Sequence, residues 1–333
     1  MGTVYVTQED AFIGKTDERL TVKADKKTIL DVPSIKVDGI VVLGRATISP
    51  AAIAELLERK IPLTFLTETG KFMGKLEPEL TKNIFVRSAQ WQAAGESEKA
   101  VHLVRGFVRG KLKNYRTMLV RNQRQYSELN LQGAIASLEK IIPSLEKTNT
   151  IDSLRGKEGA GSAAYFGVFQ QLIRTEGFSF KVRHRPAIDP VNSLLNFGYT
   201  LLRQDIQSAV NIVGFDPYLG YLHCPHYGRP SLALDLMEEF RPLVVDAMVL
   251  SAINLKVLTL NDFTIEPLSN VMRLSKEGLR EFLKLYEKKK QSKFTHPVLG
   301  RKYTYQETFE IQARLLAKYL MGETDKYPPL VQY

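Results

Sequence analysis

The hydrophobic pattern of this chain changes period once, close to residue 88. Between residues 3 and 77 it consists of short runs rich in Val, Ile, Thr and Phe, namely TVYVT, AFIGKT, LTVKA, TILDVP, GIVVLG, IPLTFLT and FMGKL. Turn-like spacers such as TDER and ADKK separate these runs, which is typical of strands in a small sheet. Beyond residue 88 the apolar residues recur every ~3.6 positions, as in LREFLKLYEKKK. The pattern therefore predicts a small β domain followed by a larger helical domain.

Chain length and two helix starts agree with this division. A chain of 333 residues exceeds the ~250–300 residues at which a single core stops growing. Within the β part, SPAAIAELLERK predicts one helix, with Ser49 as N-cap and Pro50 at the first helical position. In the helical part, Asp189 and Pro190 give the same signal.

The chain is basic, with 46 Lys and Arg against 36 Asp and Glu and a net charge of +10. Such an excess favours a polyanionic partner, nucleic acid before an acidic membrane surface. The excess gathers between residues 87 and 124, where nine basic residues stand against Glu96 and Glu98. These are Arg87, Lys99, Arg105, Arg109, Lys111, Lys113, Arg116, Arg121 and Arg124. These spacings fit either a solvated helix with a general positive charge or a phosphate-binding stripe. The same two alternatives fit the second basic segment, EKKKQSKFTHPVLGRKY.

The single cysteine, Cys224, excludes an internal disulfide framework and a Cys-rich zinc site. The start of the chain, MGTVYVTQED, lacks the basic and apolar parts of a secretion signal. No segment reaches the ~18 apolar residues of a membrane span. We therefore expect a cytoplasmic protein that does not enter a membrane.

One carboxylate, Glu158, lies in an unusual stretch, LRGKEGAGSAAYF, at residues 154–166. Three glycines there each weaken a helix by ~1 kcal/mol relative to alanine. Small residues around an acid allow another backbone, or that of a nucleic acid, to come close to it. The alternative is that they permit tight helix packing, with Tyr165 in the core. The spacing does not choose between the two.

A second set of polar residues lies in GYLHCPHYGRPSLALDLMEEFRPLVVD. His223 and His226 stand in a loop marked by Pro225, Gly228 and Pro230. The helix expected after this loop places Asp235, Glu238 and Glu239 on one face.

Carboxylates that share a helix face repel each other unless a positive group neutralises them. Arg241 is the simplest such group, and a histidine satisfied by its surroundings is the simplest explanation of His223. Taken together with Glu158, however, the acids and an imidazole form a mixed oxygen and nitrogen ligand set. Such a set suits Mg²⁺ or Mn²⁺ and leaves positions for water and phosphate oxygens.

Three of these segments also carry a resemblance. LRGKEGAGSAAYF, DPVNSLLNFGYTLL and GYLHCPHYGRPSLALDLMEEFRPLVVD follow one another as in the CRISPR-associated spacer-acquisition integrase, the larger of the two universal CRISPR adaptation proteins. The chain resembles that family over nearly its whole length. The resemblance implies an α+β fold, in which a small β-sandwich-like domain at residues 1–88 serves dimerisation and partner contact. A larger all-α catalytic domain at residues 89–333 carries the metal site.

The resemblance also implies residue roles and partners. Glu158, His223 and Glu238 would bind a divalent metal, Mg²⁺ or Mn²⁺, and Asp235 would join them as a catalytic residue. Some members have aspartate at the position of Glu238, and His226 remains a candidate DNA contact. The family implies a homodimer that binds a small ferredoxin-like adaptation protein and inserts short duplex DNA fragments into a CRISPR repeat. The basic helices would then carry sequence-independent phosphate binding.

The function expected is a metal-dependent DNA endonuclease and integrase that joins the 3′-hydroxyl ends of new spacers to the repeat. Two alternatives stay open. The same site could cut branched DNA without joining it. In the other, the chain is a non-catalytic DNA-binding scaffold whose acids only form salt bridges. A membrane-surface protein and an RNA-binding enzyme rank below both.

Overall fold

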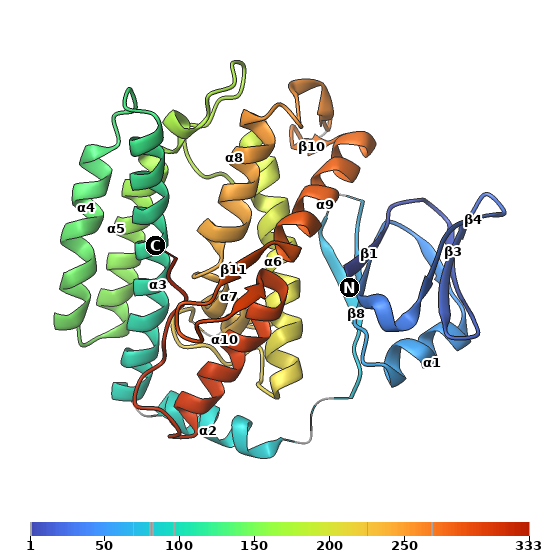
Figure 1. The fold of residues 1–333 in the computed structure, drawn as a ribbon, viewed down its shortest axis with the longest axis horizontal. Helices are drawn as coiled ribbons and strands as arrows, with labels where there is room; N and C mark the ends of the chain where they lie inside the picture. Colours follow the sequence, from blue (N-terminus) through green and yellow to red (C-terminus); the bar gives the residue numbers. More distant parts are fainter. Residues whose placement is uncertain are drawn as a thin grey trace. The chain divides into compact units, whose positions relative to one another are not determined.

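The computed structural model describes residues 2–68, 70–79, 81, 83–95, 97–224, 226–267 and 269–332. The chain divides into two compact units, Met1–Leu80 and Thr81–Tyr333 (Figure 1). Helix α2 (Ile84–Gly95) accounts for the difference from the sequence-based division at residue 88, because it already belongs to the second unit. Its exposed side chains, such as Phe85 and Trp91, obscure the helical period. Two residues used in the sequence analysis, Glu96 and Pro225, lie outside the described residues.

The first unit contains two four-stranded sheets, with strand orders β1-β5-β7-β8 and β4-β3-β2-β6. In the first sheet β1, β5 and β7 run parallel and β8 is antiparallel to β7. In the second, β2, β3 and β4 form an antiparallel meander and β6 lies parallel to β2. The elements are β1 Gly2–Val6, β2 Ala11–Thr16, β3 Arg19–Ala24, β4 Lys27–Pro33, η1 Ser34–Lys36, β5 Val37–Leu43, β6 Ala46–Ile48, α1 Pro50–Glu58, β7 Leu63–Leu66 and β8 Phe72–Leu76.

Apolar side chains of both sheets and of α1 form one core, which includes Val6, Ile13, Leu20, Val42 and Leu56. The two sheets therefore enclose a shared interior, as in a sandwich. Helix α1 begins at Pro50 because the side chain of Ser49 accepts a hydrogen bond from the amide of Ala52 at 3.1 Å. The predicted helix start is confirmed.

The second unit is mainly helical. Its helices are α2, α3 Ser97–Gln125, α4 Gln132–Ser144, η2 Leu145–Lys147, α5 Ile151–Gly167, η3 Phe169–Leu172, α6 Pro190–Val213, α7 Ser231–Met237, η4 Arg241–Asp246, α8 Ala247–Asn254, η5 Leu260–Asp262, α9 Lys276–Gln291 and α10 Tyr305–Leu320. Asp189 caps α6 by accepting from the amide of Asn192 at 2.8 Å, which confirms the second predicted helix start. Two hairpins of three-residue strands, too short for a period-2 pattern, interrupt the helices: β9 Phe263–Ile265 with β10 Met272–Leu274, and β11 Lys293–Thr295 with β12 Lys302–Thr304.

Helix α3 runs through the interior of this unit. It packs on α4 and α5, and also on α7 and η4. Figure 1 shows α3, α4 and α5 side by side. Its side chains Phe107, Leu112, Tyr115 and Leu119 are fully or almost fully buried. Polar side chains on α3 can therefore meet residues of α5 and of the segment after α7.

The helical run from Ser231 to Asn254 changes its winding in the middle. Helix α7 ends at Met237, and η4 is a π-helix. Pro242 lies at this change, and it lacks the amide that would bond to the carbonyl of Glu238 in an α-helix. Wide turns of this kind are common beside functional sites.

No helix within the described ranges combines the length and the apolar character that crossing a bilayer requires.

Candidate active site

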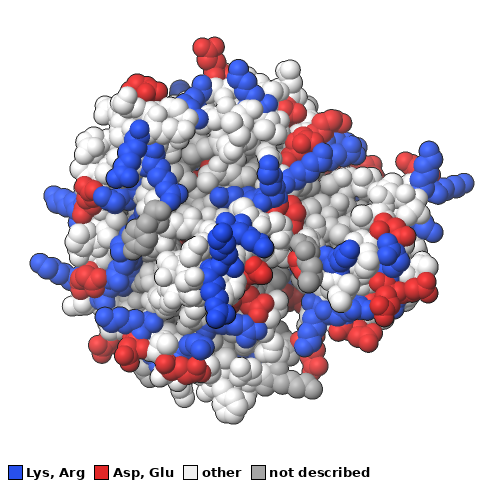
Figure 2. Space-filling model, viewed as in Figure 1, with Lys and Arg blue, Asp and Glu red and all other residues white. Residues whose placement is uncertain are grey.

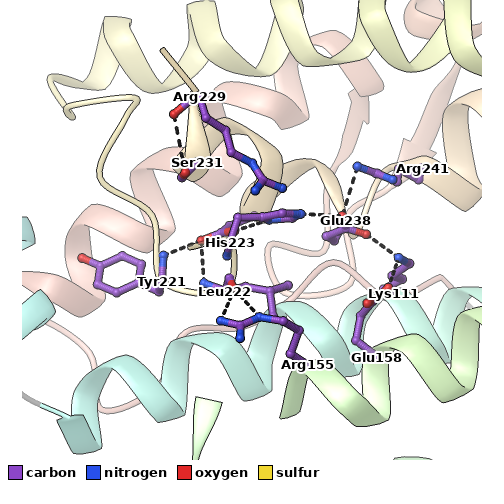
Figure 3. Close-up of polar contacts among 11 residues, drawn as sticks. Lys111, Arg155, Glu158, Tyr221, Leu222, His223, Arg229, Ser231, Glu238 and Arg241 are labelled. Atoms are coloured by element: carbon purple, nitrogen blue, oxygen red, sulfur yellow. Dashed lines mark hydrogen bonds and ion pairs between the residues drawn. The ribbon is translucent and has the colours of Figure 1, made fainter. Parts of the chain in front are cut away.

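Glu158, His223 and Glu238 reach one place from three segments of the second unit (Figure 3). Glu158 stands in the middle of α5, and Glu238 directly follows the last residue of α7. His223 lies in the loop between α6 and α7, and its Nε2 is 3.9 Å from Glu238 Oε1. The predicted site residues are thus close together in the fold.

The ammonium group of Lys111 stands between the two glutamates. Its Nζ hydrogen-bonds Glu158 Oε1 and lies 2.6 Å from Glu238 Oε2. The side chain of Lys111 is only 5% exposed. Burial would lower the pKa of Lys111, but Glu238 and Glu158 raise it above its ordinary value. A charged ammonium therefore offsets part of the negative charge of the acid pair.

Glu238 is almost completely buried, at 3% exposure, and has two cations beside it. Arg241 approaches its Oε1 at 3.1 Å, and Lys111 approaches the other oxygen. Although burial acts in the opposite direction, these two cations lower the pKa of Glu238 to about 2. The carboxylate therefore stays ionised, and Arg241 has the neutralising role that the sequence suggested.

Asp235 is fully buried and holds His223 in place. Its Oδ1 lies 2.6 Å from Nδ1 of His223 and accepts the His223 amide at 3.0 Å. Its Oδ2 accepts the amides of Tyr221 and Leu222, at 2.5 and 2.9 Å. A carboxylate that accepts the Nδ1 proton leaves the Nε2 lone pair free, and Nε2 is the atom that faces Glu238.

Helix α5 also anchors this loop. Arg155, three residues before Glu158, donates to the carbonyl of Leu222 from Nε at 3.2 Å and from its Nη2 at 3.0 Å. At Gly220 a Cβ atom would come within 2.8 Å of Asp235 Oδ2, so a larger residue would push the loop away. The position of His223 relative to Glu158 is thus fixed from both sides.

The site is closed on one side and open on the other. Glu238 and Lys111 are buried, whereas Glu158 is 21% exposed and His223 is 20% exposed. Ser162 donates to Glu158 Oε1 at 2.8 Å and orients it from the next turn of α5. A solvent-borne group can therefore reach Glu158 and His223.

The donor set fits a hard divalent cation. Two carboxylates and one imidazole nitrogen are ligands of Mg²⁺ or Mn²⁺, and a cation, the Lys111 ammonium, already lies between the two carboxylates. Over the part of the chain that the structure describes, no three His, Cys, Asp or Glu side chains form a ready-made metal-binding group. The ligand types therefore suit a divalent metal, but the Lys111 ammonium lies between the two carboxylates that would bind it.

Sequence reasoning missed the roles of Lys111 and Arg155. Lys111 entered only as one of nine basic residues, and its partner Glu158 is 47 residues away. Arg155 acts on a carbonyl 67 residues away. Neither interaction leaves a local pattern in the sequence.

The prediction that Glu239 shares a face with Asp235 and Glu238 is wrong. Glu239 is fully buried and instead accepts hydrogen bonds from Gln312, at 3.0 Å, and from Tyr327 and the amide of Leu330. The α-helical spacing ends at Met237, so the i, i+4 relation to Asp235 is not kept. Burial raises the pKa of Glu239 to about 8. This acid fastens the C-terminal segment and takes no part in the site.

Most basic residues of α3 have partners inside the unit. Lys99 donates to the carbonyl of Leu320, and Arg105 donates to the carbonyls of Leu145 and Thr148. Arg109 pairs with Glu146 and Arg116 with Glu139. Figure 2 shows basic and acidic side chains interspersed over the visible face. The α3 segment therefore holds helices together and offers few free cations for phosphates.

Tyr165 and Tyr199 belong to the core beneath the site. Both are nearly inaccessible, and Tyr165 stacks on Tyr115 with 3.8 Å between ring centroids. Tyr199 donates to Asp246 Oδ1 at 2.5 Å, and burial raises the pKa of Asp246 to about 6. His226, by contrast, is exposed at the loop.

The glycines near Glu158 separate into two kinds. A Cβ atom on Gly161 would overlap the side chain of Leu112 on α3, whereas one on Gly156 or Gly159 would meet open space. Helix packing therefore explains Gly161. Gly156 and Gly159 have no side chain that would project into the open space beside Glu158.

Comparison with known proteins gives consistent matches. The family described as "CRISPR associated protein Cas1" matches residues 4–288. A protein of Thermus thermophilus named CRISPR-associated endonuclease Cas1 3 is 38% identical over 332 residues, which cover 99% of this chain and 97% of that protein. CRISPR-associated endonuclease Cas1 1 of Chlorobaculum tepidum is 35% identical over 338 residues, 99% of this chain and 98% of that one. Among solved structures, a casposase bound to integration product has a TM-score of 0.86 at 23% identity and covers 100% of this chain and 95% of its own.

Proposed function

Since the chain belongs to the Cas1 family of CRISPR-associated proteins, we propose that it is a divalent-metal-dependent DNA endonuclease and integrase of CRISPR adaptation. It joins the 3′-hydroxyl ends of short DNA fragments to the CRISPR repeat by transesterification. One observation carries the proposal. Two acids and an imidazole from three distant segments lie close together: the Lys111 ammonium joins Glu158 to Glu238, and His223 Nε2 is 3.9 Å from the other oxygen of Glu238.

Glu158, Glu238 and Nε2 of His223 would hold Mg²⁺ or Mn²⁺. The ion, when bound, polarises the scissile phosphate and offsets the charge that develops as an oxygen attacks phosphorus. In the joining step a new bond forms between the 3′-oxygen and phosphorus, and one P–O bond of the repeat strand breaks. The attacking hydroxyl loses its proton, and the oxygen that leaves takes up a proton to become a free hydroxyl end. The number of phosphodiester bonds does not change, so neither an oxidant nor a covalent protein intermediate is needed.

The protein side chains prepare the site for this step. Asp235 keeps the proton on Nδ1 of His223, so that Nε2 keeps a free lone pair with which it can bind a metal. Arg241 supports the ionised form of Glu238. The exposed edges of Glu158 and His223 form the side from which a phosphate enters.

The family resemblance also suggests the partners. We propose that the chain acts as a homodimer, with the first unit serving dimerisation and partner contact. The homodimer would bind the small ferredoxin-like adaptation protein, and the complex would bind short duplex DNA and the repeat. The similar proteins of Thermus thermophilus and Chlorobaculum tepidum are named endonucleases, which supports the nuclease part of the proposal.

The test is joining of a labelled short duplex to a supercoiled plasmid that carries a repeat, with the small partner protein added. Glu158→Gln and His223→Ala should each lower joining by about 10²-fold or more, and EDTA should abolish it, while DNA binding is retained. Matched controls are Glu128→Gln and His102→Ala, which change exposed residues away from the site. They should join as the unchanged protein does.

The alternatives predict other results. A branched-DNA nuclease would cut labelled forks in the presence of metal and yield no joined product. A scaffold would bind DNA equally well with EDTA, and His223→Ala would change its stability and no DNA product. Joining that survives Glu158→Gln would contradict the site assignment.

A further inference from the structure

Lys111 lies between the two carboxylates of the proposed metal site. Its Nζ contacts one oxygen each of Glu158 and Glu238, the two carboxylates proposed as ligands. Of the two acids, Arg241 forms an ion pair only with Glu238, so Lys111 is the cation that pairs with both in the described part of the chain. An ammonium and a divalent ion cannot share this position, because their charges repel at such distances.

The backbone around Lys111 is fixed, so any movement of the ammonium must come from rotation of the side chain. Leu112 packs against Gly161 of α5, and Asn114 donates to the carbonyls of Glu239 and Leu330, both at 2.9 Å. Tyr115 is stacked on Tyr165. Helix α3 therefore cannot shift to remove the ammonium. The lysine side chain has four rotatable bonds, so it can move without the helix.

A second favourable interaction lies next to the acids. Nζ of Lys111 is 5.5 Å from the centroid of the Tyr115 ring, within the range of a cation–π interaction. The ammonium can therefore withdraw from the carboxylates along the ring and keep a partner. The carboxylates would meanwhile remain in place, because Arg241 and Ser162 hold them independently.

We propose that Lys111 is a positioning residue that occupies the cation position in the metal-free protein and leaves it when the divalent ion binds. It keeps the two acids together before the metal arrives, and it competes with the metal for them. The affinity of the site for metal is thereby held below that of the bare ligand set. This inference rests on the metal site of the proposed function.

The test is direct binding of Mn²⁺ to the 333-residue protein without DNA at pH 8. Electron paramagnetic resonance of the free ion measures the binding. Lys111→Met removes the competing charge and Lys111→Gln keeps a polar side chain without the charge. Both should bind Mn²⁺ about 10-fold or more tightly than the unchanged protein. In thermal melts with EDTA both variants should melt at lower temperature, and Mn²⁺ should raise their melting temperature more than it raises that of the unchanged protein.

Lys113→Met is the matched control, since Lys113 lies on the same helix and forms no ion pair with either acid in the described structure. Its Mn²⁺ affinity should not change. Equal or weaker Mn²⁺ binding by the Lys111 variants, with normal binding by the unchanged protein, would overturn the role of Lys111 and leave the metal site intact. Absence of Mn²⁺ binding in every protein would overturn both. If Lys111→Met does not fold, Lys111→Gln decides alone.

Discussion

Both carboxylate oxygens of Asp235 accept hydrogen bonds from the segment that carries His223. Three backbone amides and the imidazole Nδ1 point at it, so neither oxygen remains directed at the space between Glu158 and Glu238. A buried carboxylate in this setting orients a ligand more readily than it binds a metal itself. The sequence grouped Asp235 with the catalytic residues, and we now propose that it acts through His223.

Asp235→Asn tests that role. Asparagine keeps the shape of the side chain, but its NH₂ group cannot accept a hydrogen bond from the donors around it. The proton of His223 is then no longer held on Nδ1 by a carboxylate. We expect Mn²⁺ affinity and joining activity to fall by about 10- to 100-fold, with DNA binding retained. Isothermal titration with Mn²⁺ measures the first effect. Asp325→Asn, at an exposed position, is the control. Unchanged metal affinity in Asp235→Asn would show that Asp235 only stabilises the loop.

At the scale of elements, the packing of α3 on α5 sets the distance between Lys111 and Glu158. Leu112 is fully buried, so it cannot swing out of the way of a side chain placed at Gly161. An added methyl group would force α5 away from α3. Because Glu158 lies nearly one turn before Gly161 on the same helix, the carboxylate would move with it.

Gly161→Ala should therefore destabilise the protein by about 1–3 kcal/mol, in spite of the better helix propensity of alanine. Gly159→Ala offers the matched comparison, because its Cβ atom meets open space. It should stabilise the helix by up to ~1 kcal/mol. Urea unfolding of both variants measures the two changes in the free energy of unfolding, which we expect to have opposite signs. If both substitutions stabilise the protein, Leu112 yields and the packing argument fails.

The elements also show which features the sequence reveals. The starts of α1 and α6 were predictable, because a capping side chain, a proline and the amide that is capped lie within four residues of one another. Short hairpins such as β11–β12 were not, since three-residue strands carry no period. The segment after α7 was predicted as a regular helix, and its turn at Glu238 depends on Pro242 and on tertiary packing.

For the site, residue types suggested a mixed set of acids and an imidazole, and the family resemblance singled out Glu158, His223 and Glu238. What the sequence lacked was the position of each relative to α3. Lys111 and Arg155 act on partners 47 and 67 residues away, so only the fold reveals them. The misassignment of Glu239 has the same origin, because its partners Tyr327 and Leu330 come from the last described segment of the chain.

At the scale of the whole molecule, the net charge of +10 is not evenly available. Arg105, Arg109 and Arg116 of α3 are engaged with carbonyls or glutamates. In the second basic segment, Lys290 is fully buried beside Asp205 and Glu287. One aromatic residue of the segment, Phe294, packs on Tyr305 with 4.6 Å between ring centroids, so it is not free to stack on a base. Four other cations of this segment, however, are exposed and show no ion pair with any described residue: Lys288, Lys293, Arg301 and Lys302.

We therefore expect these four exposed cations, at the end of α9 and on the β11–β12 hairpin, to supply more phosphate binding than α3 does. Replacing all four by alanine changes the net charge from +10 to +6, since 10 − 4 = 6. Duplex DNA affinity should fall, and the slope of log K against log salt should decrease by up to about 0.9 for each phosphate that the variant no longer neutralises. Fluorescence anisotropy between about 50 and 200 mM salt measures both. A quadruple variant in the first unit makes the same charge change at exposed lysines, Lys23, Lys27, Lys36 and Lys71. If the two variants lose DNA affinity and salt dependence equally, net charge alone controls binding. If only the first variant does, the DNA phosphates bind at the end of α9 and at the β11–β12 hairpin.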